Sequence, residues 1–112
     1  MHNHDFNING RVGKITPLNG VLKVSIASTI SYKDKQTQKR EYDARWNTIT
    51  IFDDHTAKYI VENITPGDLV QAKGDVYDHN YQKNDETIYT TVLNCRSFVR
   101  LAKKAEQEEA KA

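Results

Sequence analysis

One segment of the chain, DDHTAKYIVENITPGD at 53–68, departs from the alternating pattern around it and has a helical period. Its apolar residues recur at spacings of three and four, which places them on one face of a helix: Ala57, Ile60, Val61 and Ile64. Asp53 or Asp54 is suited to cap the first turn, and the Thr-Pro-Gly sequence at 65–67 is suited to end the helix. We therefore expect one short helix in a chain otherwise built from strands.

The segments on both sides of this helix alternate apolar and polar residues, as half-buried strands do. The expected strands are 6–15, 21–31, 41–52, 68–77 and 86–101. Gly10 and Gly13 indicate a bulge or bend in the first strand, and Asn19 with Gly20 is typical of a tight turn. Polar segments at 34–39 and 78–85 are expected to be exposed connections.

The order strand, strand, strand, helix, strand, strand is that of the OB-fold, an all-β, five-stranded Greek-key barrel whose sheet face and loops bind oligonucleotides or oligosaccharides. We expect residues 1–101 to form this domain, with the short helix between strands three and four. The charged segment 102–112 has almost no apolar surface, so we expect a disordered tail or a frayed helix there.

Length and composition exclude several classes of protein. The chain of 112 residues suits a single domain with one core, and no apolar run is long enough to span a bilayer. The start, MHNHDFNING, does not resemble a signal peptide, and the single Cys95 has no partner for an internal disulfide. We therefore expect a cytoplasmic protein. The net charge of +1 indicates no overall attraction to a polyanion. Binding of a polyanion would therefore depend on a local cluster of cations.

The only tryptophan lies in ARWNTITIF at 44–52, a strand whose two faces differ. Ile49 and Ile51 fall on one face, whereas Trp46 and Phe52 fall on the other together with threonines. Two large rings beside hydroxyl groups suit neither a second core nor an ordinary solvated surface. An aromatic ring stacks on any nucleic-acid base, so this face is a candidate nucleic-acid site.

Further rings and cations would extend this candidate site in an OB-fold barrel. Tyr32 ends the second strand, and Tyr81 is expected at the tip of the loop between the last two strands. The segment 32–45 mixes tyrosines with charges, although such a run is more often a solvated hairpin. The cations expected to follow the phosphates are Lys33, Lys35, Arg45, Lys73 and Lys83, with Arg11 as a weaker candidate. The tyrosines expected to be structural are Tyr42, Tyr59, Tyr77 and Tyr89, of which Tyr77 borders the groove.

The acidic residues do not suggest an enzyme. A metal-dependent hydrolase needs two or three carboxylates that converge on a cation. Asp53 and Asp54 are adjacent and are better explained as helix caps, and the acidic residues of the last hairpin are expected in solvent. His2 and His4 have no partners at zinc-site spacing. We therefore expect no catalytic residue, no metal site and no cofactor.

Four stretches of the chain resemble the bacterial single-stranded DNA-binding protein family over nearly all of residues 6–101. They are GRVGKI, VSIASTISYKDK, EYDARWNTITIFDDHTAKYIVENITPGDLVQAKGDVYDHNYQ and YTTVLNC. In that family four aromatic positions stack on bases, and the resemblance assigns this role to Tyr32, Trp46, Phe52 and Tyr81. It also implies a homotetramer that binds single strands without strong sequence preference during replication, recombination or repair, with a dimer as the alternative. It further implies a protein of the bacterial nucleoid, or one encoded by a phage or plasmid.

Two departures from the family pattern concern its partners. Asn47 stands where the family often has a histidine near the subunit contact, and the sequence ends in EQEEAKA in place of the acidic tip that recruits replication and repair enzymes. The alternative function is an OB-fold adaptor of a replication complex, similar to the primosomal replication protein N. That alternative predicts a dimer whose DNA contacts are secondary and depend little on the stacking rings.

Overall fold

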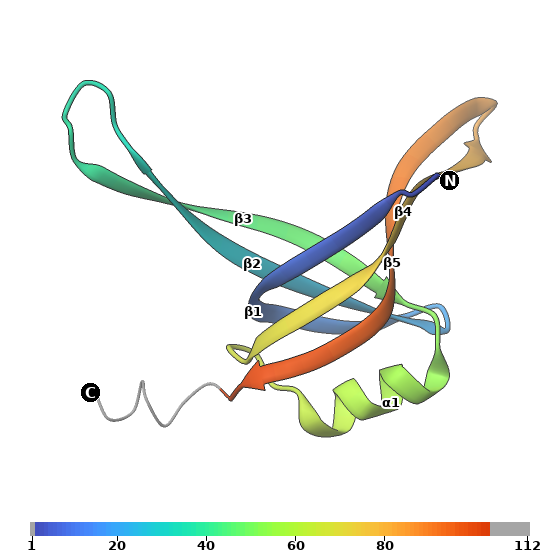
Figure 1. Cartoon of the computed structure of the whole chain (residues 1–112). Helices are drawn as coiled ribbons and strands as arrows, with labels where there is room; N and C mark the ends of the chain where they lie inside the picture. The colour runs from blue at the N-terminus through green and yellow to red at the C-terminus, as the bar shows by residue number, and fades with distance from the viewer. Residues whose placement is uncertain (1, 104–112) are drawn as a thin grey trace.

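The strands form a closed barrel in the order β1-β2-β3-β5-β4, and α1, the one helix among the residues that the structure describes, lies across one end of it (Figure 1). The computed structural model describes residues 2–103. Its elements are β1 (Asp5–Leu18), β2 (Val21–Lys33), β3 (Arg40–Ile51), α1 (Asp54–Asn63), β4 (Leu69–Lys83) and β5 (Glu86–Ala102). The expected all-β OB-fold with a helix between the third and fourth strands is confirmed. In this described part, no helix is long and apolar enough to cross a membrane.

The core lies inside the barrel and is closed at one end by α1. The inward face of β3, with Ile49 and Ile51, packs among buried residues of the other strands, and Ile60 and Ile64 of the helix side cover the open end. One parallel pair, Thr50 with Asn94, joins β3 to β5 and closes the barrel. The alternation therefore also predicts the buried side of β2, with Leu22, Val24 and Ile26, and of β3, with Ile49 and Ile51.

Two pairs of strands continue beyond the barrel as projecting arms (Figure 1). The β2–β3 arm comprises residues 28–45 and stays paired as far as Lys33 with Arg40. The β4–β5 arm comprises residues 76–93 and stays paired as far as Lys83 with Glu86. Residues 78–85 were expected to form an exposed connection, but residues 78–83 continue β4 and only residues 84–85 form the turn. The polar composition was misleading because an arm outside the barrel has no core face to fill.

The turns follow the sequence signals closely. Asn19 and Gly20 have φ values of 49° and 82°, so they form the two-residue turn in which both central residues are left-handed. Asn84 and Asp85, with φ values of 50° and 65°, form an equivalent turn at the end of the β4–β5 arm. The register of β1 against β2 shifts between Val12 and Ile15, which includes the bulge expected near Gly13.

The helix begins where the sequence predicts. Asp53 is the N-cap, and its Oδ2 accepts hydrogen bonds from the hydroxyl of Thr56 at 2.6 Å and the amide of Thr56 at 3.0 Å. These hydrogen bonds from Thr56 hold the pKa of the Asp53 carboxyl below its usual value, because they stabilise the charged form. The capping interaction explains Asp53 without any catalytic role.

A buried carboxylate, Asp68, ties the α1–β4 connection to both flanking strands. It is 1% exposed. Its side chain accepts hydrogen bonds from the amide of Thr65 at 3.0 Å and the hydroxyl of Thr65 at 3.2 Å, and Arg100 of β5 lies 3.8 Å away. Its backbone carbonyl accepts the amide of Val12 in β1. Three segments therefore meet at one charged residue.

Two further expectations concern Cys95 and the tail. Cys95 is buried, as expected for a small core residue, and burial raises the pKa of its thiol to about 11. Ala102 completes β5, so the strand includes the first residue of the expected tail. The expectation of a disordered tail or a frayed helix concerns residues 104–112, which lie outside the described residues.

Candidate nucleic-acid interface

The register of β2 against β3 divides the side chains of these strands between two faces. Directly paired residues share a face, and successive residues along a strand alternate between faces. The pairing of Ala27 with Trp46 therefore defines one set, which we name the Trp46 face. From β2 it includes Lys23, Ser25, Ala27, Thr29, Ser31 and Lys33. From β3 it includes Arg40, Tyr42, Ala44, Trp46, Thr48 and Thr50.

The opposite set is the continuation of the barrel core, and we name it the Tyr32 face. Near the barrel it consists of buried residues such as Val24 paired with Ile49. Along the arm it is formed by Ser28 with Arg45, Ile30 with Asp43, and Tyr32 with Glu41. The structure thus separates two of the sequence-predicted rings, because Tyr32 and Trp46 lie on opposite faces of one two-stranded arm.

The indole of Trp46 lies over a glycine of β1. A Cβ atom at Gly13 would overlap Cζ3 of Trp46 and lie 2.8 Å from its Cη2, so only glycine leaves room for the ring at this position. The side chain of Trp46 is nevertheless 59% exposed. The ring is therefore supported from below and open to solvent, which is the arrangement that a stacking platform requires.

The other two sequence-predicted rings are exposed but lie elsewhere. Phe52 follows the last residue of β3, directly before the N-cap of α1. Tyr81 lies near the end of β4 in the β4–β5 arm, where it stacks against His79 with ring centroids 6.4 Å apart. Tyr81 was expected at a loop tip, and the structure places it within a strand instead.

The sequence-predicted cations are distributed over three regions. Lys33 lies on the Trp46 face, and Lys35 lies in the loop that closes the same arm. Arg45 lies on the Tyr32 face, where its Nε is 3.7 Å from a carboxylate oxygen of Asp43. Lys83 ends β4 opposite Glu86. Only the first two therefore lie close to the Trp46 face without a paired carboxylate.

Lys73 and Arg11 belong to other surroundings. Lys73 lies on β4 and lines a pocket of about 450 Å³ with Phe6 and Arg96, whose guanidinium pairs with Asp75 at 2.8 Å. The guanidinium of Arg11 donates to the carbonyl of Gly67 at 3.0 Å. The geometry explains Arg11 as a structural contact between β1 and the α1–β4 connection.

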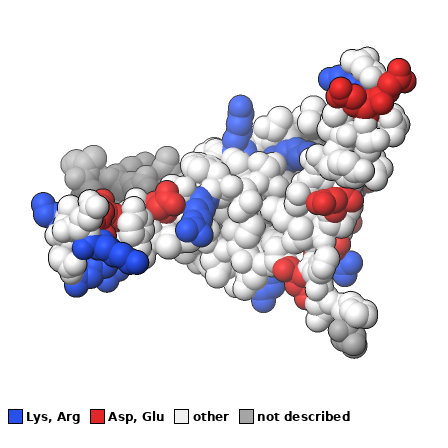
Figure 2. All heavy atoms as spheres, turned by 90° about the horizontal axis from the view of Figure 1, so that it is seen from above, with Lys and Arg blue, Asp and Glu red and all other residues white. Residues whose placement is uncertain are grey.

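The two arms differ in charge (Figure 2). Lys and Arg gather at the end of the β2–β3 arm, on the left of the view, whereas acidic residues predominate at the end of the β4–β5 arm. Among the residues paired between β2 and β3, the Trp46 face has Lys23, Lys33 and Arg40 and no acidic side chain. The acidic residues Glu41 and Asp43 both belong to the Tyr32 face. The face that presents the indole is therefore also the cationic one.

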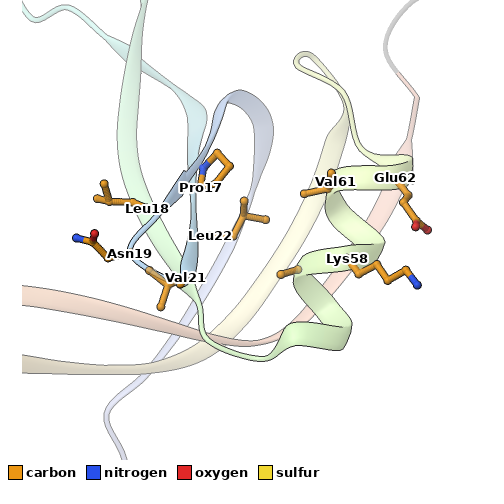
Figure 3. A pocket seen from close by; sticks show the side chains of 10 residues that line it. Pro17, Leu18, Asn19, Val21, Leu22, Lys58, Val61 and Glu62 are labelled. Carbon is orange, nitrogen blue, oxygen red and sulfur yellow. The ribbon is translucent and has the colours of Figure 1, made fainter.

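A pocket of about 480 Å³ lies apart from this face, between the β1–β2 turn and α1. Leu22 and Val61 point toward one another across it, whereas the charged ends of Lys58 and Glu62 turn away (Figure 3). Its lining includes no aromatic ring. In the described part of the chain, no three His, Cys, Asp or Glu side chains form a cluster that could hold a metal ion.

A family model described as "Single-strand binding protein family" matches residues 8–108, which is nearly the whole chain. The chain belongs to the single-strand binding protein family. Among curated relatives, the single-stranded DNA-binding proteins of Rickettsia felis and Rickettsia typhi are each 23% identical over 79 residues. The matched region covers 70% of this chain and 52% of either relative, so the chain spans about half their length.

Solved structures of this family have the same fold. The Plasmodium falciparum SSB in complex with single-stranded DNA superposes with a TM-score of 0.72, at 20% identity, over 90% of this chain and 97% of that one. The mitochondrial single-stranded DNA binding protein Rim1 of S. cerevisiae superposes with a TM-score of 0.69, at 22% identity, over 93% of this chain and all of that one. At these identities the comparison shows a shared fold and nothing beyond the fold.

All four tyrosines that were expected to be structural are exposed: Tyr42, Tyr59, Tyr77 and Tyr89. Tyr42, at 69%, is the one of these that lies on the Trp46 face. The signal was present in the sequence, because Tyr42, Ala44 and Trp46 alternate along one strand and therefore share a face. Arg40, which continues the same alternation, was also missing from the predicted cations.

Proposed function

We propose that this chain binds single-stranded DNA without strong sequence preference. The observation that carries the proposal is the exposed indole of Trp46, which lies over Gly13 on a face with cations and no acidic side chain among its β2 and β3 residues. Membership of the single-strand binding protein family supports it. A duplex hides the faces of its bases, so a stacking platform favours a single strand.

Binding would combine two physical effects. Trp46, Tyr32, Phe52 and Tyr81 would stack on bases, at roughly 1–3 kcal/mol per base. Lys33 and Lys35 would follow the phosphates beside Trp46, and Arg45 would contribute on the Tyr32 face of the same arm. Lys73 and Lys83 would contribute where the strand passes β4. No step of this function breaks a covalent bond, so we propose a binder and not an enzyme.

The test uses the only tryptophan of the chain as its probe. A thymidine oligomer should quench the fluorescence of Trp46, because a base stacked on the indole changes its environment. Affinity should fall as salt rises, with a log–log slope of about −0.7 for each phosphate engaged, since binding releases counterions. A duplex of equal length is the control and should cause little quenching.

The titration separates the proposal from its alternative. Quenching by the single strand that weakens with salt supports base stacking at Trp46. Quenching by single strand and duplex alike would contradict selectivity for single strands. No response to either would favour the adaptor function, in which the ring faces a protein partner.

We propose further that the chain acts as a homotetramer in the cytoplasm, with a dimer as the alternative assembly. Val99 and Leu101 of β5 are exposed large apolar side chains outside the Trp46 face, and a second copy would cover them. Light scattering coupled to size exclusion should give a mass near four times 12.9 kDa. A mass equal to that of one chain would exclude a stable assembly.

A further inference from the structure

Tyr42 is the most exposed large hydrophobic side chain in the described part of the molecule, at 69%. It lies in the middle of the β2–β3 arm, paired with Ser31. A structural tyrosine normally buries its ring and leaves only the hydroxyl near solvent. The ring of Tyr42 therefore contributes little to the core and is available to a ligand.

The surroundings of Tyr42 leave both it and Trp46 accessible. The two rings are four residues apart on one face of β3, which corresponds to about 13 Å along the strand. Ala44 lies between them, and Ala27, Thr29 and Ser31 face them from β2. Because these neighbours are small, they do not cover the two rings. The rings are also far enough apart for each to stack on a different base.

The charges beyond Tyr42 suit a polyanion. Lys33 and Arg40 are paired with each other next to it, and a guanidinium nitrogen of Arg40 donates to the hydroxyl of Ser31 at 2.9 Å. That hydrogen bond holds the cation beside Tyr42. Glu41 and Asp43, the nearest carboxylates along β3, belong to the opposite face. A phosphate chain that lies on Trp46 thus meets no carboxylate of β2 or β3 on this face as far as the pair Lys33 and Arg40.

We propose that Tyr42 is a further base-stacking residue, and that the bound single strand runs from Trp46 over Tyr42 to Arg40 and Lys33. This inference rests on the proposed function and adds a direction to it. The strand follows the Trp46 face of the β2–β3 arm, because that face alternates rings with small residues and excludes carboxylates. The Tyr32 face of the same arm also presents a ring that we propose to stack on a base, but Glu41 and Asp43 beside it make it the less favourable path for the phosphates.

The experiment compares two equally exposed tyrosines. Tyr42→Ala should weaken binding of a fluorescently labelled thymidine oligomer by roughly fivefold or more, since a stacked base is lost. Tyr89→Ala is the matched control, because Tyr89 is 68% exposed on β5 in the other arm, where it pairs with Asn80. That variant should bind as the unmodified chain does. Tyr42→Phe should also keep its affinity, because stacking needs the ring and not the hydroxyl.

The contribution of Arg40 to binding can be measured separately, from the dependence of affinity on salt. Arg40→Gln should reduce the magnitude of the log–log salt slope by about 0.7, the contribution of one phosphate. Lys58→Gln is the control, because Lys58 lies on α1, outside the β2–β3 arm, and its charged end turns away from the pocket beside the β1–β2 turn (Figure 3). An unchanged salt slope in Arg40→Gln would mean that the bound single strand does not reach Arg40 at the end of the β2–β3 arm.

Each remaining outcome decides the inference. If the unmodified chain binds and Tyr42→Ala binds equally well, the inference about Tyr42 is wrong while the proposed function stands. If the unmodified chain does not bind, both are wrong. If Tyr42→Ala changes the assembly size on a sizing column, Tyr42 is a contact between copies and the inference is overturned.

Discussion

Trp46→Ala should weaken binding to a thymidine oligomer by roughly 5- to 150-fold, which corresponds to about 1–3 kcal/mol. The substitution removes the ring that lies over Gly13 and leaves that part of the sheet bare. Because the side chain is largely exposed, its loss should change binding far more than stability. The variant has no tryptophan, so anisotropy of a labelled oligomer is the appropriate measurement.

Two variants sharpen this comparison. Trp46→Phe keeps a ring and should retain part of the lost affinity, whereas Val61→Ala removes an exposed apolar side chain from α1 and should leave affinity unchanged. Thermal unfolding followed by circular dichroism shows whether each variant is folded. A folded Trp46→Ala variant with the original affinity would mean that the interface lies elsewhere on the barrel.

Asp68→Ala should lower the free energy of unfolding by roughly 3 kcal/mol. Thr65 would lose the acceptor for both its amide and its hydroxyl, and Arg100 would lose a buried counter-charge. Arg100 keeps its hydrogen bond to the carbonyl of Asn63 at 2.7 Å, which limits the loss. Urea denaturation followed by circular dichroism measures the change, at equal protein concentration because assembly contributes to apparent stability.

Asp68→Asn separates charge from hydrogen bonding at this position. It preserves the shape of the side chain and one acceptor oxygen, so its cost should fall between those of the unmodified chain and Asp68→Ala. Asp43→Ala removes an exposed carboxylate that is paired only with exposed Arg45, and it should cost far less. Equal stability of Asp68→Ala and Asp43→Ala would contradict the role of Asp68 as a junction between segments.

Local patterns were sufficient for most of the fold. Alternation in segments such as 21–31 and 41–52 predicts strands because side chains on a strand alternate between two faces, and the spacing of Ala57, Ile60 and Ile64 predicts a helix for the equivalent reason. Turn chemistry predicts the reversal at Asn19 and Gly20. These signals are properties of short stretches, so the rest of the chain is not needed to interpret them.

The candidate site was predictable in part. The sequence identified Trp46 as exposed and aromatic because its strand has one apolar face and one mixed face. The rule that made this prediction applies equally to Tyr42, but the surrounding charges suggested an ordinary solvated hairpin. The division of those charges between two faces was the missing information, and it depends on which residue of β2 pairs with which residue of β3.

The sequence by itself determined the element order, the core faces of β2 and β3 and the exposed tryptophan, since each follows from neighbours a few positions apart. Only the tertiary structure decided how far the arms extend, that Gly13 of β1 supports the ring of Trp46, and that Tyr32 lies on the face opposite Trp46. These features depend on contacts and register between distant segments. A shift of one residue in the register would exchange the two faces of the arm, and no local pattern outside the core opposes such a shift.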